Sequence, residues 1–411
     1  MKLSIIICVY NTPRELFEGC LISLKKSTLF ADGRRYEAEI ITVDDGSSTD
    51  YSDLIDKYGL RYTRTENRGI FSARALGISL ATGEYVAFVD SDDTVSFDYH
   101  APMIEKADVS GADIIINDWA YHTDSSRYFT DADSTIMTEN MRLIGGEGIG
   151  AFLSQEGREH SYYVLWNKVY RRELLQNAFK KAEAAAYGIE AYNYSEDVLI
   201  NFFAFLDSRL VENVHTGYYF YRVHSSQSVS VSSREKLKKQ IFLMSFTLCE
   251  MENTLKGNAD FEKLSKHITA WREFISRSHF THAKSSAFKE LYSYIKEMYG
   301  VKNLKRSTYR DEICGMRCVP LPDNFIEIDG TFSDAWTKKT LPSLPNKTNR
   351  YMLRVTDRFI SLGFTESNEL QVPKPIIPFK KRLRFSPLLM RIARILFPKG
   401  SKARSFLKKH M

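Results

Sequence analysis

Three carboxylates occur within four positions of the segment Asp90–Asp93, which reads D-S-D-D and directly follows the apolar segment Tyr85–Val89. Such an apolar run is typical of a strand buried on both faces of a parallel sheet. The acidic side chains then lie at the carboxyl edge of the sheet, where open α/β sheets bind ligands. Because like charges this close repel one another, and because hard oxygen ligands suit Mg²⁺ or Mn²⁺, the segment predicts a clamp for a metal ion and a diphosphate. A solvated acidic turn is the alternative.

Two further apolar runs also end in polar side chains. Leu3–Val9 is followed by Tyr10 and Asn11, and Ala38–Val43 is followed by Asp44. The carboxyl ends of parallel strands meet at one sheet edge, so these side chains are expected near the acidic segment. A single Asp at a strand end is more often a helix cap than a ligand, so the prediction depends on the whole set.

The elements that position these residues follow from hydrophobic periodicity. Helices are predicted over 13–27, 52–58, 70–80 and 99–109, and strands around 60–65, 85–89 and 114–117. Strands that alternate with helices imply a parallel, doubly wound α/β sheet. Beyond residue 120 we expect a flap or short hairpin at 121–134, a strand at 166–170 leading into 171–177, a helix at 196–205 and an aromatic strand at 218–223.

The pattern becomes helical after the serine-rich segment 225–233, which is the predicted domain boundary. Helices are expected over 237–255, 261–280 and 288–299, and 320–375 predicts a loop-rich connector. We therefore expect a catalytic domain at 1–230, a mainly helical accessory domain at 235–372 and a basic amphipathic tail at 373–411.

Four segments in a fixed order carry a resemblance to a known family. They are Ser4–Asn11 (S-I-I-I-C-V-Y-N), Val43–Asp50 (V-D-D-G-S-S-T-D), Glu66–Arg74 (E-N-R-G-I-F-S-A-R) and Ala81–Asp93 (A-T-G-E-Y-V-A-F-V-D-S-D-D). Together they resemble the family 2 glycosyltransferases with the SpsA-like GT-A fold, of the kind that builds bacterial cell-surface polysaccharides. The resemblance covers roughly the first half of the chain and implies a Rossmann-like, mostly parallel sheet that binds a nucleotide-diphospho sugar.

The resemblance implies a nucleotide site. Tyr10 would stack on the base, Asp44 would accept from a base N–H, and Arg74 would lie near the phosphates, where a guanidinium can pair with their oxygens. A core aromatic and a solvated helix face are the alternatives for Tyr10 and Arg74. Gly69 would help to shape the adjoining loop. The predicted nucleotide-binding residues are Tyr10, Asn11, Asp44, Asn67, Arg74, Asp90 and Ser91.

The D-x-D of this family falls on Asp90 and Asp92. By that match Asp90 has a ribose or water-mediated role, and Mn²⁺ or Mg²⁺ is held chiefly by Asp92, with Asp93 as support. His224 ends a Y-R-x-H segment similar to one that closes over the diphosphate, which makes it a candidate metal ligand or phosphate donor. A satisfied structural histidine is the alternative.

A catalytic base is expected opposite the leaving group, to take the proton of the acceptor hydroxyl. Glu196 and Asp197 begin a predicted helix, whose N-terminal dipole stabilises an anion. They look like the acidic pair of the family, with Asp197 as the base and Glu196 as second choice; helix capping is the alternative. Trp166 and Asn167 resemble acceptor-site residues of polysaccharide enzymes. A tryptophan with a purely structural role is the alternative.

The sequence therefore predicts a metal-dependent inverting glycosyltransferase that uses a UDP-linked sugar to extend a cell-surface glycan or lipid-linked acceptor. A dinucleotide-dependent oxidoreductase is disfavoured, because no G-x-G-x-x-G follows the first strand. A catalytically silent nucleotide-sugar-binding module tethered to the membrane is the remaining alternative. The sugar, the acceptor, the linkage and the oligomeric state stay open, a homo-oligomer included.

Composition and charge bear on location. No apolar run approaches the roughly 20 residues that span a bilayer, no signal peptide is recognisable, and five cysteines fit reduced thiols, so we expect a cytoplasmic protein. The net charge of +6 conceals a tail with twelve Lys or Arg and no Asp or Glu from Lys374 onward. Its amphipathic segment Ser386–Phe397 predicts peripheral attachment to an anionic inner membrane surface. Nucleic acid is disfavoured because stacking aromatics are sparse; packing on protein is the alternative.

Overall fold

The computed structural model describes residues 2–29, 37–96, 98–117, 120–123, 127–130, 140–158, 160–190, 192–214, 217, 219–222 and 233–305, with short strands between 317 and 371. The chain forms two compact units, Met1–Leu321 and Pro322–Met411. In the second, the described elements are β14 (Phe325–Ile326), β15 (Leu353–Thr356), β16 (Phe359–Ser361), β17 (Gly363–Phe364) and β18 (Leu370–Gln371). The tail predicted at 373–411 lies outside the described residues.

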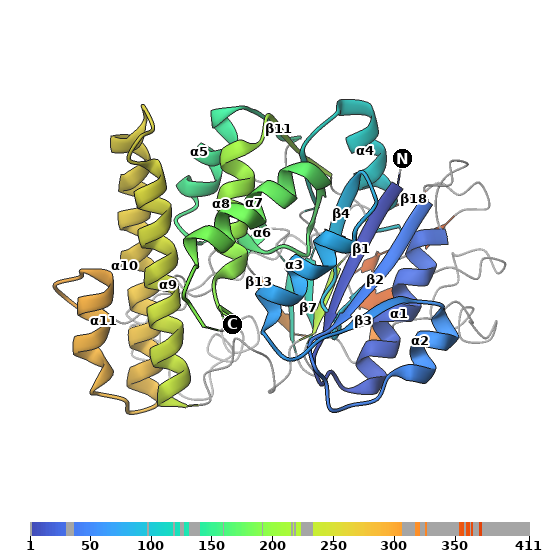
Figure 1. Ribbon diagram of the computed structural model, residues 1–411, viewed down its shortest axis with the longest axis horizontal. Helices are drawn as coiled ribbons and strands as arrows, with labels where there is room; N and C mark the ends of the chain where they lie inside the picture. Colours follow the sequence, from blue (N-terminus) through green and yellow to red (C-terminus); the bar gives the residue numbers. More distant parts are fainter. Residues whose placement is uncertain are drawn as a thin grey trace, which may run out of the picture. The chain divides into compact units, whose positions relative to one another are not determined.

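A mixed eight-stranded sheet organises the first unit (Figure 1), in the order β3-β2-β1-β4-β10-β6-β11-β9. Its strands are β1 (Lys2–Val9), β2 (Glu37–Asp44), β3 (Arg61–Arg64), β4 (Tyr85–Phe88), β6 (Ile114–Asn117), β9 (Arg142–Ile144), β10 (Lys168–Arg171) and β11 (Leu210–Val214). The first four in that order pair in parallel, which confirms the predicted GT-A arrangement, and Ile5 is in register with both Ile40 and Ala87. The strands β1, β2 and β4 therefore end at one edge.

The two faces of the sheet carry separate cores because side chains alternate along each strand. On β1, Ile6 belongs to one buried cluster, and Ile5 and Ile7 belong to the other. The cluster of Ile5 receives side chains from α1 (Arg14–Leu29), α2 (Ser52–Tyr58) and α4 (Ala101–Ser110). The cluster of Ile6 receives side chains from α3 (Ile70–Leu80), α5 (Gly146–Ser154), α6 (His160–Tyr163), α7 (Arg172–Ala185) and α8 (Glu196–Asp207). Thus β1 is buried on both faces.

Three helices follow, the long α9 (Arg234–Leu255) and α10 (Phe261–Ser285) and the short α11 (Leu291–Tyr299), and Figure 1 shows α9 and α10 side by side. Their periodicity predicted them, but the structure does not separate them from the sheet. Leu248 and Trp271 belong to the same buried cluster as Phe202 of α8. The part of the predicted accessory domain that the structure describes as helical is therefore continuous with the catalytic fold, because it covers apolar surface of that fold.

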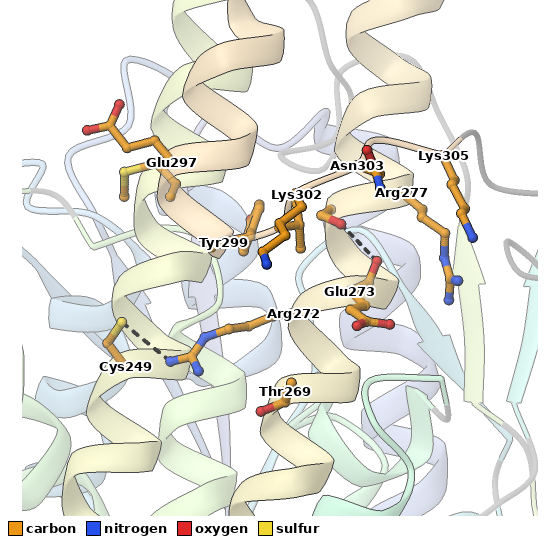
Figure 2. Close-up of a pocket in the computed structure, with 14 residues that line it drawn as sticks. Cys249, Thr269, Arg272, Glu273, Arg277, Glu297, Tyr299, Lys302, Asn303 and Lys305 are labelled. Atoms are coloured by element: carbon orange, nitrogen blue, oxygen red, sulfur yellow. Dashed lines mark hydrogen bonds between the residues drawn. The ribbon is translucent and has the colours of Figure 1, made fainter.

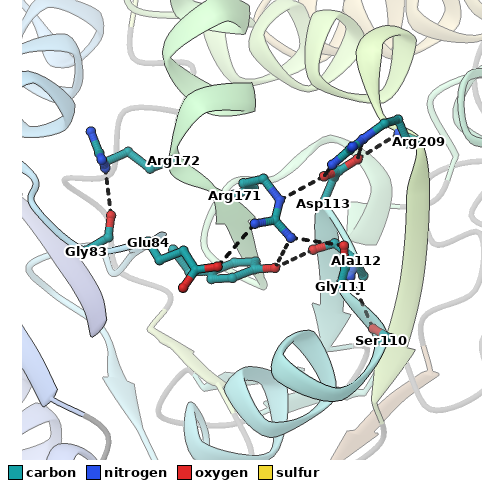
Figure 3. Close-up of polar contacts among 10 residues, drawn as sticks. Gly83, Glu84, Ser110, Gly111, Ala112, Asp113, Arg171, Arg172 and Arg209 are labelled. Carbon is teal, nitrogen blue, oxygen red and sulfur yellow. Dashed lines mark hydrogen bonds and ion pairs between the residues drawn. The ribbon is translucent and has the colours of Figure 1, made fainter. Parts of the chain in front are cut away.

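The strand β10 runs antiparallel to both of its neighbours, β4 and β6, and an arginine cluster fixes its end (Figure 3). Arg171 Nε donates to Asp113 Oδ1 at 2.9 Å and its Nη2 donates to the Tyr85 hydroxyl at 2.7 Å, while Arg209 donates to both oxygens of Asp113. Burial would raise the pKa of Asp113, but these hydrogen bonds outweigh it and lower the pKa. The cluster locks the amino ends of β4 and β6, opposite the predicted site.

A second sheet has the order β13-β8-β7-β12-β5. Its strand β5 directly follows the acidic loop in the sequence. Its strands are β5 (Thr94–Val95), β7 (Ala120–Thr123), β8 (Arg127–Thr130), β12 (Tyr219–Arg222) and β13 (Arg317–Pro320). The antiparallel β7 and β8 confirm the predicted hairpin. Tyr219 pairs with Val95, so β12 lies directly beside the chain that leaves Asp93. Across the described part of the chain, every helix is too short or too polar to cross a bilayer.

Candidate active site

The acidic loop between β4 and β5 is held from behind by Tyr219 of β12. The Tyr219 hydroxyl donates to Asp93 Oδ2 at 2.8 Å and accepts from the backbone N–H of Asp90 at 3.1 Å. Asp93 is fully buried, whereas Asp90 and Asp92 are partly exposed. Asp93 therefore anchors the loop, and the two carboxylates of the D-x-D remain accessible at the sheet edge.

The predicted acceptor residues Trp166 and Asn167 are buried behind the same loop. Trp166 stacks on Tyr219 with ring centroids 4.2 Å apart, and Asn167 is 1% exposed. Asn167 Nδ2 donates to the carbonyl of Ser161 at 3.2 Å, and its Oδ1 accepts from Lys168 Nζ at 2.7 Å. Both side chains serve internal packing in this structure, which agrees with the structural alternative and not with direct contact to an acceptor.

Arg74 joins the acidic loop to helix α8. It lies on α3, which can approach β1 closely because a Cβ on Gly77 would stand only 2.5 Å from Ile6 Cγ2. Its Nη1 donates to Glu196 Oε1 at 2.7 Å and its Nη2 donates to Asp90 Oδ1 at 3.3 Å. Burial disfavours the guanidinium, but these carboxylates outweigh burial and raise the Arg74 pKa. Arg74 thus ties Glu196 to Asp90, at the sheet edge where the diphosphate is predicted.

Glu196 and Asp197 open α8 directly after Ser195, which has a left-handed backbone with φ of 63°. Burial and, after it, the charge of Glu196 raise the pKa of Asp197 to about 7, while Arg74 opposes the shift. Asp197 Oδ1 accepts from the Val198 N–H at 2.8 Å, and the residue stays partly exposed. A carboxylate with a pKa near neutrality can accept a proton at working pH. Since Glu196 is engaged by Arg74, Asp197 is the better placed of the two.

Lys168 is a buried cation that the sequence analysis missed. It is 1% exposed, and its Nζ donates to the carbonyl of Val164 at 2.6 Å as well as to Asn167. Burial lowers the Lys168 pKa well below its usual value, and the charge of Asp197 opposes that shift. The available signal was a lysine within the predicted strand 166–170, directly before the apolar Val169 and Tyr170, because a charge in such a place is rarely buried without a partner.

The turn that presents the acidic pair is held by helix α9. Thr247 Oγ1 lies 2.6 Å from the Tyr192 hydroxyl and 2.8 Å from Ser195 Oγ, and Thr247 is fully buried. The Tyr192 hydroxyl also donates to the carbonyl of Ser195 at 3.1 Å. These contacts stabilise the left-handed Ser195, so a residue of the helical region supports the start of α8. No sequence pattern singled out Thr247.

The end of β1 presents one exposed aromatic side chain and one loop-closing amide. Tyr10 is 53% exposed, as the predicted stacking on a base requires. Asn11 has a φ of 50°, and its Oδ1 accepts from the N–H of Ser48 at 2.7 Å and from its hydroxyl at 2.8 Å. Asn11 therefore ties the β1 loop to the β2 loop, while Tyr10 stays available at the edge.

Asp44 is fully buried in this structure. Its Oδ1 accepts from the N–H of Ser47 at 2.7 Å, and its Oδ2 accepts from the Tyr62 hydroxyl at 2.7 Å. The predicted hydrogen bond from a nucleobase to Asp44 is therefore not open in this conformation, because no surface of the residue is exposed. The sequence placed Asp44 at the correct edge but could not show that the protein itself uses both oxygens.

Asp45 and Gly46 shape the loop that carries Asn67. The carboxylate of Asp45 accepts from the N–H groups of Arg68 and Gly69 at 2.8 and 2.9 Å. Gly46 has a φ of 80°, and a Cβ there would lie 2.7 Å from the nitrogen of Asn67. Asn67 is exposed and its Oδ1 accepts from Gly69 N at 3.2 Å. This loop sets the start of α3, which carries Arg74.

The donor set for a metal is small. Within the described ranges no group of three or more His, Cys, Asp or Glu is arranged to hold a metal ion, and the candidate His224 falls outside those ranges. Asp90 and Asp92 provide hard oxygen ligands at an accessible edge. Mg²⁺ commonly takes one or two carboxylates and shares itself with substrate phosphates, and this pair fits that requirement. Ser91, between them, is buried against Thr12, 2.6 Å between hydroxyl oxygens.

The comparison with protein families decides the identity of this fold. Residues 4–179 match the family described as Glycosyl transferase family 2. This part of the chain is similar in sequence to glycosyltransferase family 2. The matched residues of the glycosyltransferase include β1 to β4, the acidic loop and Arg74, whereas Asp197 lies beyond them.

Relatives of the glycosyltransferase carry the same kind of name. EpsH of Bacillus subtilis, named as a glycosyltransferase, is 27% identical over 274 residues, which cover 64% of this chain and 72% of that protein. The cholesterol galactosyltransferase of Borreliella burgdorferi is 28% identical over 280 residues, covering 64% and 70%. Among solved structures, S. aureus TarS 1-349 in complex with UDP-GlcNAc has a TM-score of 0.45 and 18% identity, covering 73% of this chain and 92% of that one. The family match and the two named relatives identify a glycosyltransferase, whose donor and acceptor are argued separately.

Proposed function

We propose that the glycosyltransferase is a metal-dependent, inverting enzyme that transfers a hexosyl or N-acetylhexosaminyl group from a UDP-linked donor to a hydroxyl of a cell-surface glycan or lipid-linked acceptor. One arrangement carries the proposal. Arg74 links Asp90 of the D-x-D to Glu196, and the neighbouring Asp197 is partly exposed with a pKa of about 7. Arg74 thus connects the leaving-group side, where Asp90 lies, with the acidic pair that contains the proton acceptor Asp197.

In the proposed reaction Asp197 takes the proton of the acceptor hydroxyl as the hydroxyl oxygen attacks the anomeric carbon. The bond from that carbon to the diphosphate breaks on the opposite face, and UDP leaves with the electron pair, so the configuration inverts. Asp197 later returns the proton to water. Burial raises the pKa of Glu196, but Arg74 opposes that rise and orients the side chain, which leaves Asp197 as the carboxylate that accepts the proton.

The donor would lie along the edge formed by β1, β2 and β4. The exposed Tyr10 offers a stacking surface for the base, and the loop of Asn67 borders it. Mn²⁺ or Mg²⁺, held by Asp92 with Asp90, would neutralise the charge on the diphosphate leaving group. Asp93 supports these ligands through its bond to Tyr219.

The base assignment is tested by Asp197→Asn, with Glu196→Gln as the matched variant. Asn keeps the shape of the side chain but accepts no proton, so transfer should fall on the order of a thousandfold while donor binding persists. Transfer would be followed as UDP release with acceptor, and donor binding by calorimetry. A dead Glu196→Gln beside an active Asp197→Asn would reverse the assignment. No UDP release by the wild type, with or without acceptor, would favour the silent binding module.

We also propose that the basic tail attaches the enzyme to the inner face of the cell membrane, which would bring a lipid-linked acceptor within reach. The support is its charge, about 1 kcal/mol for each basic residue near an anionic leaflet before saturation. Flotation of liposomes with full-length protein and a version ending at Glu369 tests it. Full-length protein alone should float with anionic vesicles. Equal flotation of both proteins, or none, would make the tail a packing element and favour a soluble acceptor.

A further inference from the structure

A cavity of about 700 Å³ lies among the helices of the helical region, apart from the residues discussed above (Figure 2). It is bounded by α9, α10, the end of α11 and the segment 300–305. None of its lining residues is predicted to bind the nucleotide-sugar donor or the glycosyl acceptor, or to act in catalysis. A ligand in this cavity would therefore be distinct from the diphosphate of the donor.

The cavity wall is basic. Four cationic side chains line it, against the two exposed carboxylates Glu273 and Glu297; the cations are Arg272, Arg277, Lys302 and Lys305. Arg272 already pairs with Glu252 at 2.8 Å and lies 3.6 Å from the sulfur of Cys249. Among the residues that the structure describes, the other three cations form no ion pair. Cations that face one cavity without carboxylate partners repel one another and favour an anion between them.

Arg277 gives the strongest indication of a ligand. Its Nε is buried, and it has no hydrogen-bond partner in the structure. Buried polar groups are nearly always satisfied, so this guanidinium is short of an acceptor, and the residue is partly exposed where it lines the cavity. Figure 2 shows Arg277 on α10 and Lys305 beyond α11 extending in the same direction. A guanidinium fork beside ammonium groups matches the oxygens of phosphate.

We propose that this cavity binds a phosphate group, either as inorganic phosphate or as the monoester of a phosphorylated saccharide. A phosphate monoester carries a charge of roughly −1.5 to −2 at neutral pH, which suits the three cations that lack carboxylate partners. The volume lies within the range of about 300 to 1,000 Å³ typical of small-ligand pockets, so the cavity has room for the sugar as well as the phosphate. Arg277 receives the phosphate oxygens, and Lys302 and Lys305 close over them.

The test is isothermal calorimetry on the full-length chain with inorganic phosphate and, separately, glucose 6-phosphate, both in the presence of saturating UDP and Mn²⁺ so that the donor site is filled. The variant Arg277→Gln removes the charge and the Nε donor. The matched control is Lys266→Gln, an exposed cation on the same helix that does not line the cavity. Wild type and control should bind alike, and Arg277→Gln should lose about tenfold in affinity or more.

The relative affinity for the two probes identifies the source, since a phosphorylated saccharide should bind more tightly than inorganic phosphate if the sugar contributes contacts. Equal affinities with the same Arg277 dependence would still support the phosphate site and assign it to free phosphate. No binding by the wild type, or equal binding by Arg277→Gln, would overturn the proposal. An equal loss in Lys266→Gln would also overturn it, because nonspecific charge would then explain the effect. If Arg277→Gln does not fold, the double variant Lys302→Gln and Lys305→Gln decides, since both lysines are exposed.

Discussion

Two pairs of adjacent carboxylates in this molecule differ in their hydrogen-bond partners. Asp44 and Asp45 follow β2, and their oxygens accept hydrogen bonds from their own surroundings, the backbone N–H groups of Arg68 and Gly69 among them. Glu196 and Asp197 begin α8, where Arg74 holds only the first. Burial and the charge of Glu196 then raise the pKa of Asp197 to about 7.

The difference shows what distinguishes a structural carboxylate from a reactive one. Burial raises the pKa of Asp45, but the N–H groups of Arg68 and Gly69 oppose that rise and fix the carboxylate in its loop. A carboxylate that is desolvated beside a second carboxylate is destabilised as an anion and therefore takes up protons. Substitutions in the two regions should consequently separate loss of stability from loss of chemistry.

The largest expected effect is that of Asp92→Ala, at the accessible acidic edge. The fold should remain intact because Tyr219 anchors the loop through Asp93, while turnover with Mn²⁺ falls on the order of a thousandfold or more. Steady-state transfer over a Mn²⁺ titration measures it. A variant that keeps more than about a tenth of the wild-type turnover would contradict the metal clamp.

The second prediction concerns stability at the acidic pair. The pKa of Asp197 is raised to about 7 in the folded state, above the value of about 3.9 for an unfolded chain. The wild type therefore loses stability as the pH rises through this interval, whereas Asp197→Asn does not. Thermal unfolding should show the inactive variant to be more stable than the wild type at about pH 8, with convergence near pH 4. A less stable variant at the higher pH would show that the carboxylate is structural.

Asp45→Ala is expected to have a smaller effect, and one on stability instead of turnover. The N–H groups of Arg68 and Gly69 lose their acceptor, which should cost about 1 to 3 kcal/mol of unfolding free energy. The turnover number of the folded enzyme should change little, with the loss appearing in the KM for the donor. Urea unfolding measures the first and initial rates the second. The exposed Asp56→Ala on α2 is the control, and a comparable loss there would remove the special role of Asp45.

The smallest effect is expected for Thr247→Val, which keeps the shape but removes the hydroxyl near Tyr192 and Ser195. Looser support of the turn should lower kcat about threefold to tenfold and shift the pKa seen in its pH profile. Thr247→Ser should restore both. A reduced melting temperature with an unchanged pH profile would instead show that Thr247 stabilises the fold without positioning Asp197.

The sequence alone indicated the parallel strands β1 to β4, most of the helices and the edge at which the polar residues meet, but not β9, β11 or the antiparallel course of β10. The apolar runs before Tyr10, Asp44 and Asp90 and the spacing within α9 and α10 are local signals, because a strand repeats every two residues and a helix every 3.6. A recognisable helix start marked Glu196 and Asp197, and the family resemblance singled out Asp197 of the two. The order of the four motifs was enough to indicate the family.

Only the tertiary structure decided how those residues are used. Arg74 and Glu196 are 122 positions apart and meet because α3 and α8 cover the same face of the sheet. The burial of Trp166, the closed surroundings of Asp44 and the support from Thr247 likewise depend on which elements pack together. A sequence pattern reports which side of an element is apolar, but not which partner covers it, and burial by that partner sets the exposure, charge and hydrogen bonding of each side chain.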